Sequence, residues 1–186
     1  MHEPLGPPIV IEGCQPHCVL GKEHMTILLG ESQRSDVPFL RRMLYEAVFW
    51  RAGANRPSFE EGLAYPEVGK SLADWGERHG DIAVVATDDS IPVGAAWLRF
   101  WTDSNATNGY VDEATPVLVI AVHRDYRRQG IGRRMIEWLV DYASKHSIRR
   151  ISLNVSKDNY ALNLYRQQGF LEYADNRDAF TMVRSL

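Results

Sequence analysis

A turn rich in glycine and arginine carries the residue types in this sequence that most clearly suggest chemistry. Residues 127–133 read Arg-Arg-Gln-Gly-Ile-Gly-Arg and lie between an apolar run, residues 117–122, and a segment with helical periodicity. A strand-to-helix junction aims several unpaired backbone N–H groups at one point, and the helix dipole adds partial positive charge there. Glycines at 130 and 132 would let an anion approach the backbone closely. The segment therefore predicts a phosphate or pyrophosphate site.

The charges around this turn indicate a local anion site in a chain that is acidic overall. Asp125 is the only acid near the turn, and the arginines around it are Arg124, Arg127, Arg128, Arg133 and Arg134. The whole chain of 186 residues has a formal net charge of −3. A balance so close to neutral gives no reason to expect nucleic acid or a membrane surface as a partner.

Other nucleotide-binding motifs fit this turn poorly. A dinucleotide fingerprint would need a third glycine where Met135 stands. It would also need an acid about 20 residues later, where Arg149, Arg150 and Ile151 offer none. The Gly-x-x-x-x-Gly-Lys-Ser/Thr phosphate loop is absent. On these residues alone, a tight turn whose glycines only permit helix–strand packing stays open.

Two linked motifs resemble the GNAT family of N-acetyltransferases. Arg127-x-x-Gly130-x-Gly132 matches the family's Arg/Gln-x-x-Gly-x-Gly/Ala pyrophosphate motif. Residues 159–170 match its downstream Asn-x-x-Ala/Ser-x-x-Leu-Tyr-x-x-x-Gly-Phe pattern, with the small residue displaced to Ala161. The resemblance is close over residues 117–183 and extends loosely back to about residue 26. It implies an α/β fold with a central mixed, mostly antiparallel sheet flanked by helices, in which a splayed strand pair holds the cofactor.

The local patterns predict where the elements of this fold lie. Strands are expected at residues 26–29, 82–86, 92–100, 117–122, 151–155 and 180–183. Helices are expected after the caps Ser35 or Asp36, Ser58, and Asp158 or Asn159, and over residues 69–79 and 130–145. On the helix over 130–145, the expected buried stripe is Ile131, Met135, Trp138, Leu139 and Tyr142.

Residues 25–186 are expected to form one domain, and residues 1–24 a flexible extension. The extension contains Cys14 and Cys18 near His17 and His24, but it has no second Cys-x-x-Cys pair to complete a tetrahedral metal site. We therefore expect no bound metal. Two cysteines, no secretory signal and no apolar run long enough to span a bilayer favour a cytoplasmic location.

The family resemblance implies acetyl-CoA as the acyl donor and assigns roles to particular residues. Backbone groups of Ile120 and Val122 would bond the pantetheine arm and the thioester oxygen, turn amides would hold the pyrophosphate, and Asn159 would reach the arm. Tyr165 would be the catalytic acid that protonates the departing thiolate. The residues implied in cofactor binding are Ile120, Ala121, Val122, Arg127, Arg128, Gln129, Gly130, Ile131, Gly132, Arg133 and Asn159.

The general base and the acceptor are left open by the sequence. The strand at residues 117–122 contains no acid, so the candidates for the base are Asp112, Glu113 and His123, each of which could equally be a solvated residue. Large aromatic residues of the first half could line an acceptor pocket or fill the core: Trp50, Tyr65, Trp75, Trp97 and Trp101. The acceptor would be the primary amine of a small molecule or a peptide, and a homodimer is possible. The alternative function is a non-catalytic acyl-CoA-binding sensor; a nucleic-acid-binding module fits poorly because the arginine cluster is too compact.

Overall fold

The computed structural model describes residues 26–51, 53 and 56–186. The expected extension over residues 1–24, with its cysteines and histidines, lies outside the described residues. The strands are β1 (Ile27–Glu31), β2 (Ile82–Asp88), β3 (Ile91–Arg99), β4 (Val117–Val122), β5 (Arg150–Ser156), β6 (Leu171–Asn176) and β7 (Ala179–Ser185). The helices are α1 (Val37–Val48), α2 (Phe59–Ala64), α3 (Pro66–Gly69), α4 (Ile131–Lys145) and α5 (Leu162–Gln167). Short 3₁₀ turns are η1 (Arg34–Asp36), η2 (Lys70–Leu72), η3 (Asp103–Asn105) and η4 (Arg124–Tyr126).

The strands of the described chain form one seven-stranded sheet in the order β1-β2-β3-β4-β5-β7-β6. Every neighbouring pair is antiparallel except β4 and β5, which are parallel. The predicted mixed, mostly antiparallel sheet is therefore confirmed. The sequence patterns missed β6, whose residues are mostly exposed at the edge of the sheet and so lack an apolar alternation.

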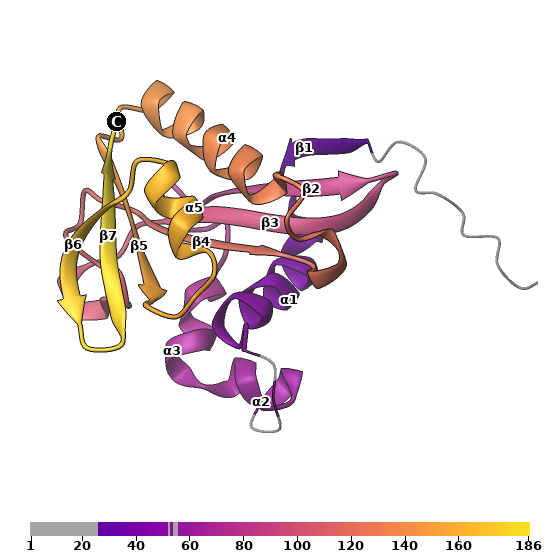
Figure 1. Cartoon of the computed structure of the whole chain (residues 1–186), viewed down its shortest axis with the longest axis horizontal. Coiled ribbons are helices and arrows are strands. Elements are labelled where there is room, and N and C mark those ends of the chain that lie inside the picture. Colours follow the sequence, from indigo (N-terminus) through magenta and orange to yellow (C-terminus); the bar gives the residue numbers. More distant parts are fainter. Residues whose placement is uncertain (1–25, 52, 54–55) are drawn as a thin grey trace, which may run out of the picture.

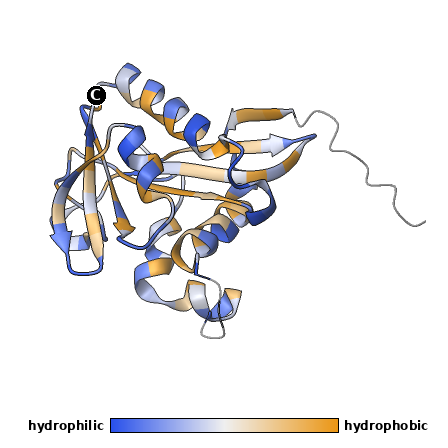
Figure 2. Cartoon of the chain, viewed as in Figure 1, coloured by the Kyte–Doolittle hydropathy of each residue, from blue (hydrophilic) through white to orange (hydrophobic). Residues whose placement is uncertain are grey.

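The sheet separates two helical layers (Figure 1). Helix α4 packs on β2, β3 and β4, whereas α1 packs on β3 and β4 from the opposite face, where α2 and α3 also lie. Each face of the sheet has a hydrophobic core, and alternate residues of the central strands pack into one or the other. Val84 packs in the core beneath α4, and Val85 packs in the core beneath α1. Figure 2 shows hydrophobic residues along the central strands and at intervals along α4. No helix within the described ranges is long and apolar enough to cross a membrane.

The buried face of α4 differs in part from the predicted stripe. Ile136 and Ala143 are buried, while Trp138 and Tyr142 are only half-buried at the margin of the helix. The two aromatic rings stack with an interplanar angle of 9° and a centroid distance of 5.9 Å. Aromatic side chains with a polar atom favour such marginal positions because the polar atom stays near water.

The parallel pair β4–β5 is joined only at its beginning. The register contains a single partner pair, Val117 and Ser152, and the Ser152 N–H donates to Pro116 O over 3.0 Å. Beyond this point the strands diverge, which confirms the predicted splayed pair. Beside it, Gly109 packs closely on β5: a Cβ at this position would lie 2.9 Å from the backbone of Leu153 and Asn154.

Residues 69–79 do not form the predicted helix. The chain there passes through the end of α3 and the turn η2, and several of its carbonyl groups accept from the buried guanidinium of Arg99. The shortest of these bonds joins Arg99 to Ala73 O at 2.6 Å. Arg99 also lies 3.0 Å from Asp81, and both side chains are 1% exposed. Carbonyls that point at one guanidinium cannot also continue a helical hydrogen-bond ladder.

Because the charge of Arg99 is buried, we expect Asp81→Ala to lower the free energy of unfolding by about 3–5 kcal/mol. Urea denaturation monitored by circular dichroism measures this change. Asp141→Ala is the matched control, since Asp141 pairs with Lys145 at the surface and should change stability by about 0.5 kcal/mol or less. Equal effects of the two substitutions would show that the buried pair does not stabilise this fold.

Candidate active site

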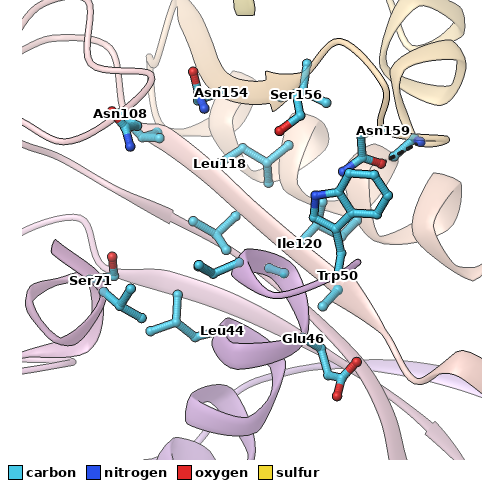
Figure 3. A pocket seen from close by; sticks show the side chains of 18 of the residues that line it. Leu44, Glu46, Trp50, Ser71, Asn108, Leu118, Ile120, Asn154, Ser156 and Asn159 are labelled. Carbon is cyan, nitrogen blue, oxygen red and sulfur yellow. Dashed lines mark hydrogen bonds between the residues drawn. The ribbon is translucent and has the colours of Figure 1, made fainter. Parts of the chain in front are cut away.

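The divergence of β4 from β5 opens two cavities that share one wall. The first, about 300 Å³, lies between β4, the end of β5 and the helices α1 and α3 (Figure 3). The second, also about 300 Å³, lies between the end of β4, the start of α4 and α5. The residues that line both cavities are Ile120, Ala121, Val122, Arg127, Tyr160, Ala161 and Tyr165. The end of β4 therefore faces both helical layers of the molecule.

The free edge of β4 presents backbone groups to this gap. His123 N donates to Val93 O at 2.8 Å, so His123 points its peptide groups toward β3. Peptide groups alternate along a strand, and those of Ala121 therefore also point toward β3, while those of Ile120 and Val122 point toward the gap. Binding of the pantetheine arm by Ile120 and Val122, as the family resemblance implies, would need this orientation. Ala121 contributes to the cavity walls but not to the free edge.

The turn after β4 has the backbone shape of an anion cradle. Gly130 is the N-cap of α4 with φ +77°, and Arg128 also has a positive φ of 63°. The amides of Ile131, Gly132 and Arg133 begin α4 and have no acceptor within the helix. Successive free N–H groups after a left-handed residue form a concave anion site.

Gly132 keeps the second cavity open between β4 and α5. A Cβ at this position would lie 3.3 Å from Leu164 Cδ2 and 3.7 Å from Ile120 Cδ1. Gly130 has a different requirement, because a Cβ added there would have no other atom within 4 Å, and only its positive φ favours glycine. The two glycines of the motif therefore serve different needs, one of space and one of backbone conformation.

The polar side chains of the turn point in different directions. Gln129 Nε2 donates to Asp125 O at 3.3 Å, within the same turn. Arg133 pairs with Glu137 at 2.7 Å along the surface of α4. Arg127 turns inward, where Nε donates to Val122 O at 2.9 Å. Arg128 is exposed at the second cavity and makes no hydrogen bond or ion pair with the described residues.

Tyr165 and Asn159 both reach the first cavity. The Tyr165 side chain, 8% exposed, lines both cavities and packs edge-on against Phe170. Burial, with a smaller contribution from Tyr160, raises the pKa of the Tyr165 phenol, so that it stays protonated at neutral pH. Asn159 Oδ1 accepts from Ala161 N at 2.8 Å at the entry to α5, and the residue borders the first cavity.

None of the three predicted candidates for the base lines either cavity. Asp112 pairs with Arg150, and the neighbouring Thr115 side chain, followed by the charge of Arg150, lowers the pKa of its carboxyl. Glu113 borders a separate cavity beside Trp101. His123 is exposed next to Asp125. The structure places all three outside the site because they precede or follow the strand rather than project from its free edge.

Two acids that the sequence patterns did not single out line the first cavity, Glu46 and Glu67. Glu67 is 71% exposed and pairs with Lys70 at 2.7 Å. Glu46, 25% exposed, pairs with Arg56 at 2.7 Å and Arg127 at 3.4 Å. Its position in α1 could not be linked to β4 by sequence spacing, because the ion pair with Arg127 spans 81 residues.

Only one of the five aromatic residues considered for an acceptor pocket lines the first cavity, Trp50. It contacts Tyr160 edge-on, with ring centroids 5.9 Å apart. Trp97 and Trp101 are buried, Trp75 packs on Trp97, and Tyr65 is 51% exposed. Among the described residues, no group of three or more His, Cys, Asp or Glu side chains is arranged to hold a metal ion.

Comparison with known proteins identifies relatives of both the sequence and the fold. A sequence model of the acetyltransferase (GNAT) family matches residues 45–170. The chain is similar to the [ribosomal protein bS18]-alanine N-acetyltransferase of Escherichia coli K12, with 39% identity over 95 residues, which cover 47% of this chain and 64% of the relative. The match thus spans less than two thirds of the relative's length.

Solved structures of low sequence identity share the fold. The PaiA N-acetyltransferase of Thermoplasma acidophilum, in complex with coenzyme A, has a TM-score of 0.63 at 16% identity, covering 87% of this chain and 100% of that chain. The ribosomal-protein-S18-alanine N-acetyltransferase of Escherichia coli has a TM-score of 0.59 at 23% identity, covering 86% and 94%. With the family match spanning most of its length, and with the splayed strands and the glycine turn in place, the chain belongs to the acetyltransferase (GNAT) family.

Proposed function

We propose that this protein transfers the acetyl group of acetyl-CoA to a primary amine. The observation that carries the proposal is the gap between β4 and β5, which joins an anion-binding turn on one side to a polar cavity on the other. Tyr165, which lines both cavities, stands where donor and acceptor would meet. The family membership supports the same chemistry.

The residues present fit acetyl-CoA as the donor. The free amides of Ile131, Gly132 and Arg133 suit a diphosphate, and the exposed Arg128 adds positive charge beside them. The backbone of Ile120 offers a donor and an acceptor at the free edge of β4, as a pantetheine arm lying like an added strand would need. Asn159 would contact that arm from the opposite side of the gap.

The proposed reaction is direct transfer. The acceptor nitrogen attacks the thioester carbonyl carbon, so that a C–N bond forms and the C–S bond breaks. The Val122 N–H, which points into the gap, would stabilise the oxyanion. Tyr165 would donate its proton to the departing thiolate, and the proton lost by the amine passes to solvent. The raised pKa of Tyr165 makes its phenolate a strong base, which returns it to the protonated form for the next cycle.

The first cavity favours an acceptor with neutral polar groups around its amine. Asn108, Asn154 and Ser71 line it, and their side chains make no hydrogen bond with the described residues. The two acids of this cavity are already paired with arginine or lysine, so little unpaired negative charge is available to bind a polycationic acceptor. A peptide amine fits these features, and the Escherichia coli relative is named for acetylation of a ribosomal protein alanine. A small-molecule amine of similar polarity is the second acceptor class.

A binding-only role as an acyl-CoA sensor is the second candidate function. It is favoured by one observation, namely that none of the predicted bases reaches the cavities. Acetyl-CoA binding without turnover on any peptide or small-molecule amine would support the sensor.

We expect Gly132→Glu to abolish acetyl-CoA binding in isothermal titration calorimetry. The new side chain starts 3.3 Å from Leu164 and adds a negative charge at the proposed diphosphate site. Gly132→Ala is the size control and should bind more weakly than wild type but measurably. Unchanged binding by a folded Gly132→Glu protein would contradict the assignment of the turn.

We expect Tyr165→Phe to lower kcat by about 100-fold or more while acetyl-CoA still binds, because only the proton donor is removed. Steady-state kinetics with a peptide amine, together with calorimetry, measures both quantities. Tyr160→Phe is the control, since Tyr160 borders the same cavities but its side chain is largely exposed. Similar kcat losses for the two variants would refute the acid role of Tyr165.

The raised pKa of Tyr165 also predicts the pH dependence of the wild-type rate. The proton-donating form persists above the usual tyrosine pKa of about 10, whereas a peptide α-amine loses its proton near pH 8. The rate should therefore rise through about pH 8 and show no decline before about pH 10. A decline at lower pH that disappears in Tyr165→Phe would show that the phenol ionises early.

A further inference from the structure

We infer that Arg127 is a positioning residue that sets where the donor's pantetheine arm pairs with β4, rather than a side-chain ligand of the diphosphate. The inference rests on the proposed function, and it assigns the first residue of the glycine-arginine motif a role different from that of the turn amides. It follows from where the guanidinium of Arg127 lies and from what it occupies.

Arg127 occupies the last acceptor on the free edge of β4. Its Nε donates to Val122 O at 2.9 Å, and the peptide groups of Val122 point into the gap between β4 and β5. The carbonyl of Val122 is therefore already bonded, while its N–H has no partner among the residues that the structure describes. The nearest remaining acceptor on this edge is Ile120 O.

A second set of contacts fixes the guanidinium in this place. Arg127 Nη2 lies 3.4 Å from Glu46 Oε2, and the other oxygen of Glu46 accepts from Arg56 at 2.7 Å. The Arg127 guanidinium also lies over the ring of Tyr160, 5.7 Å from its centroid. The side chains of Arg127, Glu46 and Arg56 are each about a quarter exposed, so the pairs are partly shielded from solvent.

This arrangement opposes a slip of an added strand toward the end of β4. A strand with a repeating hydrogen-bond pattern can slip along an open edge when equivalent acceptors follow one another. Because Val122 O already accepts from Arg127, the nearest open acceptor for an amide N–H of the arm is Ile120 O, which leaves Val122 N–H for the thioester oxygen. A slip of the arm would instead move the thioester away from Tyr165.

The same contacts direct Arg127 away from the diphosphate. Although Arg127 also lines the second cavity, its Nε is bonded to Val122 O at the end of β4 and its Nη2 to the Glu46 carboxylate of α1. Glu46, which Arg127 shares with Arg56, partly offsets the charge of Arg127. Arg128, exposed at the second cavity without a polar partner among the described residues, is the arginine available to an anion.

The experiment compares Arg127→Ala with Arg128→Ala using two donors, acetyl-CoA and S-acetylpantetheine, which lacks the diphosphate. We expect Arg127→Ala to lower kcat by about 100-fold with both donors, the size of loss that small misplacement of reacting groups causes. Its dissociation constant for acetyl-CoA should change less than threefold. Arg128→Ala should instead raise KM for acetyl-CoA, which has the diphosphate, and not KM for S-acetylpantetheine, which lacks it.

Glu46→Gln provides a second variant that keeps Arg127 but loosens it. We expect a smaller fall in kcat in the same direction, and the double variant with Arg127→Ala should be no worse than Arg127→Ala alone, because both substitutions remove one linked contact. Arg127→Lys should not restore kcat, since an ammonium group lacks the fork that reaches Val122 O and Glu46 together. Thermal melting measures whether each variant is folded. If Arg127→Ala does not fold, the kcat of Glu46→Gln tests the inference.

A weaker acetyl-CoA affinity of Arg127→Ala, with normal kcat and no loss with S-acetylpantetheine, would overturn the inference and make Arg127 a diphosphate ligand. A kcat of Glu46→Gln equal to that of the wild type would show that the contact between Arg127 and Glu46 of α1 does not help to position the donor. Failure of the wild-type protein to bind acetyl-CoA or to acetylate any amine would instead refute the proposed function, so the two failures are distinguishable.

Discussion

The separation of β4 from β5 beyond Val117 and Ser152 is the constraint on which the rest of this structure depends. Backbone N–H and C=O groups inside a protein require partners, and an open strand edge in the middle of a sheet leaves a row of them unpaired. In this protein the row points into a gap bordered by the end of β4 on one side and by α5 and Tyr165 on the other. A ligand with amide groups of its own can bond these backbone groups and so complete the sheet at this place.

The layered architecture places different chemistry on the two sides of that gap. On the α4 side, the turn at Gly130 supplies free amides, because a helix begins there without acceptors for them. On the α1 side, the cavity wall includes Val68 of α3 and Ser71 of η2, and the carbonyl of Ser71 accepts from the buried guanidinium of Arg99. The proposed transfer needs a donor anchored on one side and an acceptor on the other, and the sheet keeps the two regions apart except at the end of β4.

The arginines near the turn illustrate how folding divides a cluster of like residues among separate tasks. Arg133 pairs with Glu137 on the surface of α4, and Arg134 donates to Ile27 O of β1 at 2.9 Å. Arg127 is bonded to Val122 O and Glu46, and Arg128 alone is exposed at the second cavity without a polar partner in the described chain. A charge count around the turn would treat these side chains as equivalent, although their partners show that they differ.

The sequence by itself determined the features that depend on local pattern: the hairpin of β2 and β3, the amphipathic α4, the capping box at Ser58, and the glycine turn whose conformation Gly130 requires. Two motifs at the right separation also indicated the family and the splayed pair. Tertiary structure alone decided which distant groups meet. It placed Asp112, Glu113 and His123 outside the two cavities beside β4 and brought Glu46 to Arg127 across 81 residues. It also drew the carbonyls of residues 70, 71, 73 and 74 onto Arg99 instead of into an α-helix. The reason is physical: periodicity and capping act within one or two turns of chain, whereas ion pairs and buried hydrogen bonds depend on how complete elements pack against each other.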